Sequence, residues 1–451
     1  MDQSIFREYD IRGIVGTQLT DKAVAQIARA IGTFFVQNGV QKICLGYDAR
    51  ESSPRFAELL REGLNSCGVD VLDIGRVPTP VLYYTLFAAD VGGGVMITGS
   101  HNPADHNGFK ICLGRQALFG DQIREIGQIA LTGQFAGGSG VTESRTVLDD
   151  YRRDVISRIS MGKRRLKVVV DSGNGMGGVT AVPVYKALGV DVIELYSDPD
   201  PNFPNHHADP TVEENLRDLV EAVRENNADV GVAFDGDADR VGVVDENGRI
   251  LWGDELMVIY SRELLKERPG STIIGEVKCS QTLFDDIASH GGKPLMWKAG
   301  HSLIKAKMKE TGAVLAGEMS GHTFFADRYY GFDDACYAGA RLLEILSKTD
   351  EPLSQLTVDL PRTFTTPEIR VACPDDRKFE VVEAIAEKYS KGHEVVTIDG
   401  ARVQFEHGWG LVRASNTQAL LVLRFEADSA EHLDAIMRDV YASLAAMGVN
   451  P

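Results

Sequence analysis

Three times along the chain, an apolar strand pattern is followed by an amphipathic segment and then by a second strand pattern that ends in a polar loop. The first strands are expected at 43–46, 168–171 and 272–275, and the second strands at 94–98, 230–234 and 313–316. Strands that alternate with helices are typical of βαβ units, in which helices cover a mostly parallel sheet. The repeat therefore predicts three similar α/β domains.

The pattern changes past residue 365, where helices are expected at 379–390 and 430–447 and strands at 408–412 and 419–426. Since a domain averages about 150 residues, the length of 451 residues predicts about three domains, and the new pattern adds a smaller α+β domain. The predicted domains are 1–150, 151–252, 253–365 and 366–451.

Acidic side chains outnumber basic ones, 65 to 47, and the formal net charge is -18. Such a charge opposes binding to nucleic acid and to anionic membranes, and we expect neither partner. An anionic small-molecule substrate would require the few cations to gather at one cleft.

Six cysteines are spread along the chain without a CxxC pair, which indicates reduced thiols. The N-terminus lacks the basic start and apolar stretch of a secretory signal, and no apolar run approaches the roughly 18 residues of a membrane span. We expect a soluble cytoplasmic protein and, although no pattern bears on the oligomeric state, a monomer.

Three aspartates, Asp235, Asp237 and Asp239, alternate directly after the second strand pattern of the second predicted domain. They can converge on one divalent cation, and hard oxygen ligands favour Mg²⁺ or Ca²⁺. With Glu246 they match ligand positions of an EF-hand, but Arg240 stands where that loop needs glycine, and both flanks are strand-like. A solvated acidic turn is the simpler interpretation; the buried strand before the loop favours a metal site.

A serine between small residues follows the corresponding strand of the first predicted domain, in Thr-Gly-Ser-His-Asn-Pro at 98–103, with Lys110 a few residues on. Small neighbours would leave the Ser100 hydroxyl accessible. Alone, this segment is better explained as an ordinary turn with a helix cap. The Gly-x-Ser-x-Gly frame of serine hydrolases is absent here and at 300–304, which disfavours acyl transfer.

In the third predicted domain, Glu318, Ser320 and His322 alternate, and two glycines in the same segment, Gly317 and Gly321, would let a ligand approach the backbone. A carboxylate and a hydroxyl suit the hydroxyl groups of a sugar. A tight turn with a buried, hydrogen-bonded histidine explains the segment equally well.

The fourth predicted domain has a polar loop between two expected strands, Arg413-Ala414-Ser415-Asn416-Thr417. Its guanidinium, hydroxyls and amide could hold one phosphate group. A polar hairpin without a ligand is an equal alternative.

A dinucleotide site is a further alternative, because residues 173–178 contain Gly-x-Gly-x-x-Gly after a strand, with Glu194 one βαβ spacing later. Asp171 and Ser172 stand between the strand and the first glycine, and Pro183 is expected to interrupt the helix that would receive the pyrophosphate. Both features argue against this alternative.

Taken together and in this order, the four loops make the chain resemble the α-D-phosphohexomutase superfamily over its whole length. The loop at 317–322 and the opening Phe-Arg-Glu-Tyr-Asp-Ile-Arg-Gly at 6–13 are similar to the bacterial phosphomannomutase/phosphoglucomutase group. The resemblance implies four domains around a central cleft: three related α/β domains with mixed, mostly parallel sheets, and a C-terminal α+β domain similar to the TATA-binding protein.

The resemblance also implies roles for individual residues. Ser100 would be the phosphoserine, and its phosphoryl oxygen would join Asp235, Asp237 and Asp239 around one Mg²⁺ per chain. Catalytic candidates beside it are His101, Lys110, Arg240 and His322, of which Lys110 and His322 would transfer protons. Substrate-binding candidates are Tyr9, Arg12, Lys278, His301, Glu318, Ser320, His322, Arg413, Ser415, Asn416 and Thr417. Gln418-Ala419 stands where many members have proline at the second position, which puts the rigidity of the phosphate loop in doubt.

The implied activity is the interconversion of hexose 1-phosphate and hexose 6-phosphate, with hexose 1,6-bisphosphate as intermediate and activator. The sequence does not separate mannose from glucose. Alternatives are a phosphoglucosamine mutase, a Mg²⁺-dependent sugar phosphatase with Asp235 as nucleophile, and a noncatalytic sugar-phosphate-binding protein.

Overall fold

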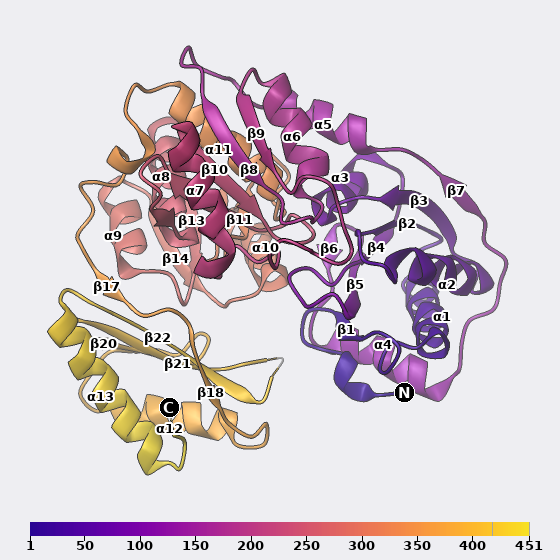
Figure 1. Cartoon of the computed structure of the whole chain (residues 1–451). Helices are drawn as coiled ribbons and strands as arrows, with labels where there is room; N and C mark the ends of the chain where they lie inside the picture. The colour runs from indigo at the N-terminus through magenta and orange to yellow at the C-terminus, as the bar shows by residue number, and fades with distance from the viewer. Residues whose placement is uncertain (417, 451) are drawn as a thin grey trace.

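The computed structural model describes residues 1–416 and 418–450, and this part of the chain forms four β-sheets in sequence order. Three sheets are mixed, with parallel strands at their centre, and the fourth is antiparallel. Helices pack against all four sheets, and the C-terminal unit lies at one side of the other three (Figure 1). The fold class predicted from the sequence is confirmed; the limits of the four predicted domains stay a prediction.

The first sheet has the strand order β1-β5-β4-β2-β3-β7, with β6 paired to β5. Its strands are β1 (Ile11–Ile14), β2 (Lys42–Tyr47), β3 (Asp70–Arg76), β4 (Gly93–Ile97), β5 (His106–Leu113), β6 (Gln116–Ala117) and β7 (Thr142–Ser144). The helices of this unit are α1 (Asp21–Gln37), α2 (Ser53–Ser66), α3 (Thr79–Ala88) and α4 (Asp121–Thr132).

The second and third sheets have the orders β12-β11-β10-β8-β9 and β14-β13-β15-β16. The second unit contains α5 (Leu148–Ser157), β8 (Lys167–Asp171), α6 (Gly177–Ala187), β9 (Asp191–Leu195), α7 (Arg217–Asn226), β10 (Val230–Phe234), β11 (Val241–Asp245) and β12 (Ile250–Leu251). The third contains α8 (Gly253–Glu267), β13 (Thr272–Glu276), α9 (Gln281–Ser289), β14 (Lys293–Trp297), α10 (His301–Thr311), β15 (Leu315–Gly317), β16 (Thr323–Phe325) and α11 (Ala335–Ser347).

One strand order recurs in the three mixed sheets: β5-β4-β2-β3, then β11-β10-β8-β9, then β16-β15-β13-β14. In each sheet an inner strand (β4, β10 or β15) is parallel to one neighbour and antiparallel to the strand that follows it in the chain. The loops of Ser100, of the aspartates and of Glu318 each connect these two strands. The three predicted loops therefore occupy one topological position, repeated.

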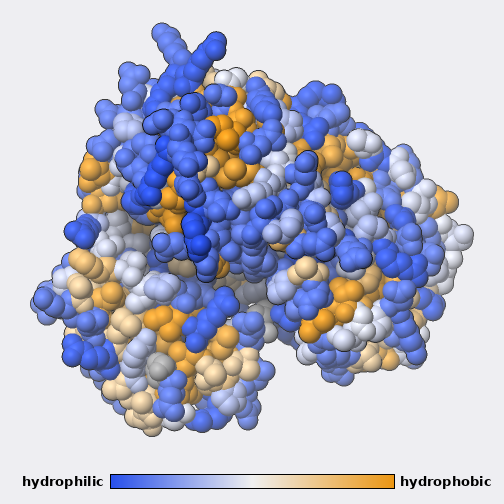
Figure 2. All heavy atoms as spheres, in the orientation of Figure 1, coloured by the Kyte–Doolittle hydropathy of each residue, from blue (hydrophilic) through white to orange (hydrophobic). Residues whose placement is uncertain are grey.

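The first three units share a continuous apolar core, whereas the C-terminal unit has its own. This last unit contains β17 (Phe364–Thr365), β18 (Ile369–Ala372), α12 (Lys378–Tyr389), β19 (Val395–Val396), β20 (Ala401–Phe405), β21 (Gly408–Ala414), β22 (Leu420–Ala427) and α13 (Ala430–Ala446). A small cluster of Val277, Trp409 and Leu411 joins it to the third unit, and Figure 2 shows a deep hollow between it and the N-terminal unit.

One expectation about the second unit is wrong: α6 continues through Pro183 instead of ending there. Proline lacks the N–H that would bond the carbonyl of Val179, and Arg152 Nη2 donates to that carbonyl instead, at 2.6 Å. The Gly-x-Gly-x-x-Gly segment also packs against the aspartate loop. There the backbone N–H of Met176 donates to the carbonyl of Gly236 at 3.0 Å and is not free to bind a phosphate. This packing, rather than a broken helix, argues against a dinucleotide at the start of α6.

All six cysteines are buried, and none forms a disulfide within the described chain. No helix of that part of the chain is both long and apolar enough to cross a membrane.

A buried carboxyl group ties the units together and makes stability depend on pH. Asp334 caps α11 and accepts hydrogen bonds from Tyr151 at 3.0 Å, Tyr329 at 2.8 Å and the amide of Tyr337 at 2.9 Å. Burial outweighs these donors and raises the pKa of Asp334 to about 6. The folded chain therefore holds a proton there that the unfolded chain loses near pH 4.

We predict that the stability advantage of the wild type over Asp334→Asn falls as pH rises from 4 to 7. A raised carboxyl pKa contributes stability below the unfolded value, and this contribution is lost as pH rises through the folded value. The loss amounts to at most about 3 kcal/mol. Urea unfolding at each pH measures it, with the exposed Asp121→Asn as the matched control. A difference in the free energy of unfolding between the wild type and Asp334→Asn that stays constant with pH would contradict the prediction.

Candidate active site

Ser100 follows β4 in a strained loop and is almost completely buried. Its φ is +48°, a conformation that costs free energy in a residue with a side chain. The hydroxyl donates to Asp235 Oδ2 at 2.8 Å and lies 3.0 Å from His101 Nδ1. The serine loop and the aspartate loop, which come from different sheets, therefore meet directly.

Arg50, which the sequence analysis did not identify, holds the serine loop in place. Arg50 is 2% exposed, and its guanidinium donates to the carbonyls of Ser100 at 2.8 Å and His106 at 2.9 Å. Asp48 pairs with Arg50 at 3.3 Å and accepts from the amide of Gly99 at 3.1 Å. These contacts fix the loop on both sides of the serine and compensate for its strain.

Asp235, Asp237 and Asp239 are fully buried, and their oxygens lie within 4.8 Å of one another. Lys110 on β5 donates to Asp237 Oδ2 at 2.7 Å and also pairs with Asp239. Thr79, at the start of α3, donates to the same oxygen of Asp237. The aspartate loop is thus held largely by residues of the N-terminal unit.

The three carboxyl groups differ in their proton affinity. Burial, Asp239 and Asp237 raise the pKa of Asp235 well above its ordinary value. Burial and Asp239 also act to raise the pKa of Asp237, but Lys110 outweighs them and lowers it. The pKa of Asp239 is lowered well below its ordinary value, because Lys110 and His322 outweigh its burial. Lys110, His322 and Arg240 favour the charged forms of these carboxyl groups, but at Asp235 burial and the two neighbouring aspartates outweigh the cations.

The group fits a divalent cation on two observations. Asp237 Oδ1 is buried and has no hydrogen-bond partner within the described residues. Asp235 lies between like charges, and a cation would remove the penalty that raises its pKa. Oxygen ligands alone suit a hard ion such as Mg²⁺.

His322 joins the aspartate loop to the Glu318 loop. Its Nδ1 lies 2.6 Å from Glu318 Oε2, and its Nε2 lies 3.1 Å from Asp239 Oδ1. Burial would lower the pKa of His322, but Asp239 and Glu318 raise it to about 9, so both ring nitrogens carry protons near neutral pH. For Glu318, the contact with His322 outweighs burial and lowers the pKa to about 2. Arg240 adjoins them through a backbone bridge to His322.

Two glycines permit the loops to approach. A Cβ on Gly236 would lie 2.3 Å from the carbonyl oxygen of Ser100. A Cβ on Gly321, whose φ is +96°, would lie 2.4 Å from the carbonyl oxygen of Val241. Any side chain at either position would push the serine, aspartate and Glu318 loops apart.

Contacts between units enclose the cleft beyond the serine. Tyr9 donates from its hydroxyl to the carbonyl of Ala299 at 3.1 Å and accepts from Asn416 Nδ2 at 2.9 Å. Arg12 donates to Asn102 Oδ1 at 2.7 Å, beside the serine loop. The first, third and fourth units therefore meet at Tyr9.

The cations expected at the far side of the cleft are buried and paired. Lys278 Nζ lies 3.2 Å from Glu368, and Arg413 Nε donates to Asp399 at 2.7 Å. Arg413 lies near the end of β21, and Ser415 directly follows this strand and accepts from the amide of Gln418 at 3.2 Å. Thr417 lies outside the described residues.

His301 begins α10 in the same region, with its Nδ1 3.6 Å from Asp333 Oδ2. Burial and the cations of Lys305 and Lys110 lower the pKa of His301 well below its ordinary value. Ser320 is half-buried on the Glu318 loop. Asp333, like Arg50 and Thr79, could not be predicted from the sequence. None of the three belongs to a recognisable motif, and the residues of the site that they contact are distant in the chain.

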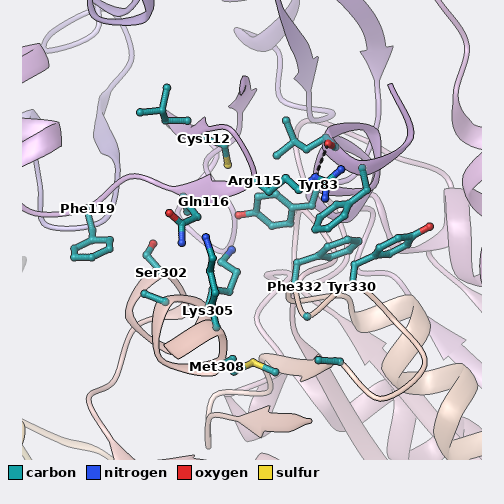
Figure 3. Close-up of a pocket in the computed structure, with 18 of the residues that line it drawn as sticks. Tyr83, Cys112, Arg115, Gln116, Phe119, Ser302, Lys305, Met308, Tyr330 and Phe332 are labelled. Atoms are coloured by element: carbon teal, nitrogen blue, oxygen red, sulfur yellow. Dashed lines mark hydrogen bonds between the residues drawn. The ribbon is translucent and has the colours of Figure 1, made fainter. Parts of the chain in front are cut away.

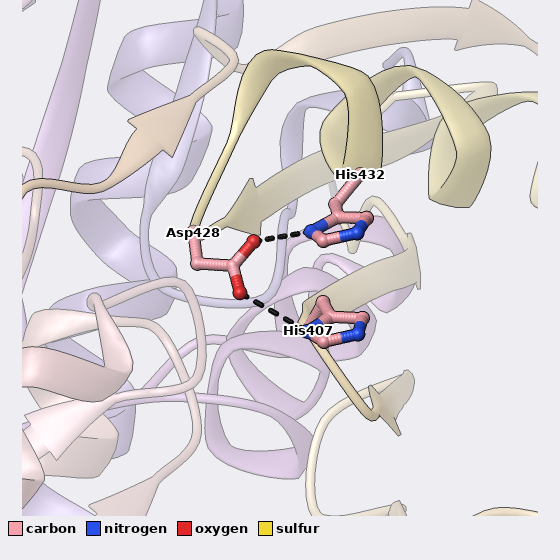
Figure 4. A group of neighbouring side chains, drawn as sticks. All are labelled: His407, Asp428 and His432. Carbon is pink, nitrogen blue, oxygen red and sulfur yellow. Dashed lines mark hydrogen bonds and ion pairs between the residues drawn. The ribbon is translucent and has the colours of Figure 1, made fainter.

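Another group of potential metal ligands lies in the C-terminal unit. His407 and His432 stack with ring centroids 3.9 Å apart, and each contacts Asp428 through Nδ1 (Figure 4). All three side chains are exposed, in contrast to the aspartates beside Ser100.

Family models for phosphoglucomutase/phosphomannomutase match almost the whole chain. The models of the alpha/beta/alpha domains I, II and III match residues 3–136, 149–248 and 252–364, and that of the C-terminal domain matches 368–443.

Relatives and solved structures agree with this match. The phosphomannomutase/phosphoglucomutase of Pseudomonas aeruginosa is 48% identical over 434 residues, which are 96% of this chain and 94% of that protein. The phosphoglucomutase of Neisseria gonorrhoeae is 45% identical over 96% of this chain and 95% of its own. A crystal structure of a phosphoglucomutase/phosphomannomutase family protein from Burkholderia thailandensis has a TM-score of 0.93 and 44% identity, covering 99% of this chain and 98% of that one. The chain belongs to the phosphoglucomutase/phosphomannomutase family, whose members are phosphohexomutases.

Proposed function

We propose that this phosphohexomutase carries its phosphoryl group on Ser100 and interconverts hexose 1-phosphate and hexose 6-phosphate through a hexose 1,6-bisphosphate. The observation that carries this proposal is the 2.8 Å contact between the Ser100 hydroxyl and Asp235 Oδ2. A serine ester at this position would lie against the group best suited to hold a divalent cation. Mannose and glucose phosphates are both proposed substrates, and glucosamine phosphate is a lesser one.

Proton balance follows from the side chains around Ser100. When the sugar hydroxyl attacks phosphorus, the P–Oγ bond breaks, the hydroxyl loses a proton and Ser100 Oγ gains one. In the return transfer Ser100 Oγ attacks the bisphosphate and must lose its proton. Burial and the charges of Arg240 and Arg12 lower the pKa of His101 well below its ordinary value, so its neutral ring can accept that proton from Oγ. His322 is protonated and can donate one. Lys110 has a raised pKa, because its two carboxylate partners outweigh burial, and so acts as a fixed cation; the proton transfer expected of it from the resemblance stays a prediction.

Asp235, Asp237 and Asp239 would hold one Mg²⁺. When bound, the ion would neutralise charge on the transferring phosphoryl group. Arg240 lies beside the same loop and adds a fixed positive charge.

The remaining residues would hold the sugar and the second phosphate. Glu318 and Ser320 would bind the sugar hydroxyls, with His301 and Tyr9 closing the cleft around them. The nonreacting phosphate would be bound by the cations and hydrogen-bond donors of the far side, namely Lys278, Arg413, Ser415 and Asn416, and by Thr417 as the sequence resemblance implies. Arg12 would bind the substrate from beside the serine loop. After the first transfer, the bisphosphate exchanges its two ends and returns the other phosphate to Ser100. A cytoplasmic monomer stays our prediction.

The phosphoserine is tested by the intact mass of the enzyme after incubation with Mg²⁺ and glucose 1,6-bisphosphate. We expect a gain of one phosphoryl group, located on the peptide that contains Ser100 and absent from Ser100→Ala. Ser139→Ala, at an exposed serine, should behave like the wild type. A phosphoryl group on Asp235, lost on treatment with hydroxylamine, would contradict the proposal and favour a phosphatase.

The cation site is tested by thermal unfolding without substrate. A ligand that binds only the folded state stabilises it by RT ln(1 + [L]/Kd), so saturating Mg²⁺ should raise the Tm by at least about 2 °C. Asp237→Asn should lose this shift, because its buried oxygen would no longer be charged, whereas Asp121→Asn should retain it. Chelation should abolish mutase turnover, and added Mg²⁺ should restore it. An equal Tm shift in Asp237→Asn would contradict the assignment.

The contact between the two loops is tested by Gly236→Ala. Its Cβ would meet the Ser100 carbonyl oxygen at 2.3 Å, so the loops must separate. A misplacement of about 1 Å at reacting groups can cost about 100-fold in rate, and we expect a loss of that order in kcat. Gly137→Ala is the matched control, because nothing lies within 4 Å of its Cβ. Unchanged kcat in a folded Gly236→Ala enzyme would contradict this role.

A further inference from the structure

A cavity of about 740 Å³ lies between the N-terminal and third units, outside the cleft described above. Its walls come from α3, the β5–β6 hairpin, α10 and the segment 326–332, and α10 packs directly against β6 (Figure 3). Pockets of roughly 300–1,000 Å³ are the usual size for small-molecule sites. This cavity is large enough for a ligand with two fused aromatic rings.

The charges around the cavity have one sign. Arg115, Lys305 and Lys309 line it, and no Asp or Glu is among the described lining residues. This one-sided lining is unexpected in a chain of net charge -18, where acidic side chains are the more common. Arg115 and Lys309 are exposed at the rim, while Lys305 is half-buried inside. The lining therefore favours an anion.

Aromatic rings provide the apolar part of the wall. Tyr330 and Phe332 stack in parallel with an interplanar angle of 4°, and Phe87 lies against Tyr330 with ring centroids 4.7 Å apart. The guanidinium of Arg115 sits 4.5 Å from the centre of the Phe87 ring. Such surfaces favour a flat, apolar ring system next to a negative charge.

Two hydroxyl groups at the cavity lack partners. Ser302 Oγ and the Tyr83 hydroxyl are buried, and neither has a hydrogen-bond partner within the described residues. Each residue is 2% exposed, and Figure 3 shows both among the side chains that surround the cavity. Because burial of an unpaired hydroxyl costs free energy, each would donate to an acceptor on a ligand that displaces the side chains covering it.

We propose that this cavity is a second ligand site, which binds a small organic anion with a flat aromatic body. The aromatic body lies against Phe87 and Phe332, and its acidic group lies near Arg115, Lys305 and Lys309. Ser302 and Tyr83 donate hydrogen bonds to it. A hexose phosphate lacks the apolar ring system that this wall suits.

The site is connected to the catalytic cleft through α10. Lys305 Nζ donates to Asp333 Oδ1 at 2.7 Å, and Asp333 Oδ2 lies 3.6 Å from Nδ1 of His301. An anion beside Lys305 competes with Asp333 for the ammonium. Since Ser302 directly follows His301, occupancy of the cavity also moves the first turn of α10. This coupling rests on the proposed role of His301 in the cleft.

Fluorescence titration with 8-anilinonaphthalene-1-sulfonate tests the site in the Mg²⁺-loaded enzyme, with glucose 1,6-bisphosphate present to fill the cleft. We expect saturable binding of one probe per chain. The Kd should rise at least tenfold in the Arg115→Ala/Lys309→Ala double variant. Ala306→Trp, which fills the cavity, should abolish binding. Lys307→Ala is the control, because Lys307 lies on the same helix but packs over Trp297, outside the cavity.

Further measurements test separately the preference of the site for an anion and its coupling to the cleft. The uncharged N-phenyl-1-naphthylamine should bind at least tenfold more weakly than the sulfonate, and 10 mM glucose 6-phosphate should not displace the sulfonate. Binding that is equal in Ala306→Trp and the wild type, or that is indifferent to the charge of the probe, overturns the site. Saturating sulfonate should change kcat at least twofold in the wild type and not in Ala306→Trp. Unchanged kcat in the wild type overturns the coupling to the cleft.

Discussion

The contact between the Ser100 hydroxyl and Asp235 is the constraint on which the rest of the site depends. It requires two loops from different sheets to lie within hydrogen-bond distance, although one is strained and the other carries three buried carboxylates. Arg50 holds the first loop through its carbonyls, and Lys110 neutralises part of the second. Gly236 leaves the space between them. Without these three residues, strain and charge repulsion would separate the loops.

The repeated strand order explains how one cleft acquires such different chemistry. Each mixed sheet presents the loop between a parallel strand and the antiparallel strand that follows it. Since the loops occupy equivalent positions, arranging the three units around one centre brings all three loops together. Evolution of the loop sequences could then provide a hydroxyl in one unit, carboxylates in the next and a carboxylate–histidine pair in the third, with little change to the sheets.

Local patterns were sufficient to predict the inner strands of the repeat, two strands of the C-terminal unit and the positions of the four loops, because each is encoded in a short stretch of sequence; strands such as β3, β5, β9 and β14 were not predicted. The alternating aspartates, for example, could be placed directly after an apolar strand without any tertiary information, and this placement favoured a metal site over a solvated turn. The partners of these loops were not predictable in this way. Arg50 contacts residues about 50 positions away, and Thr79 contacts Asp237 across 158 positions. The expectation that Pro183 interrupts its helix was wrong for the same reason, because the group that compensates for the missing N–H belongs to Arg152, on another helix.

The negative net charge of the chain does not represent the local charge at the two places where we expect anions to bind, the cleft and the cavity beside α10. At physiological ionic strength the Debye length is about 8 Å, so exposed acidic side chains on distant surfaces are largely screened. Charges within the cleft are screened much less, and there the buried Lys110 and His322 and the half-buried Arg240 lie beside the aspartate loop. A cleft of this kind attracts an anion at short range while the net charge of the whole protein stays negative. The cavity beside α10 follows the same principle with a different lining: its apolar wall excludes water from one side of Lys305, which strengthens the interaction of that ammonium with any anion that enters.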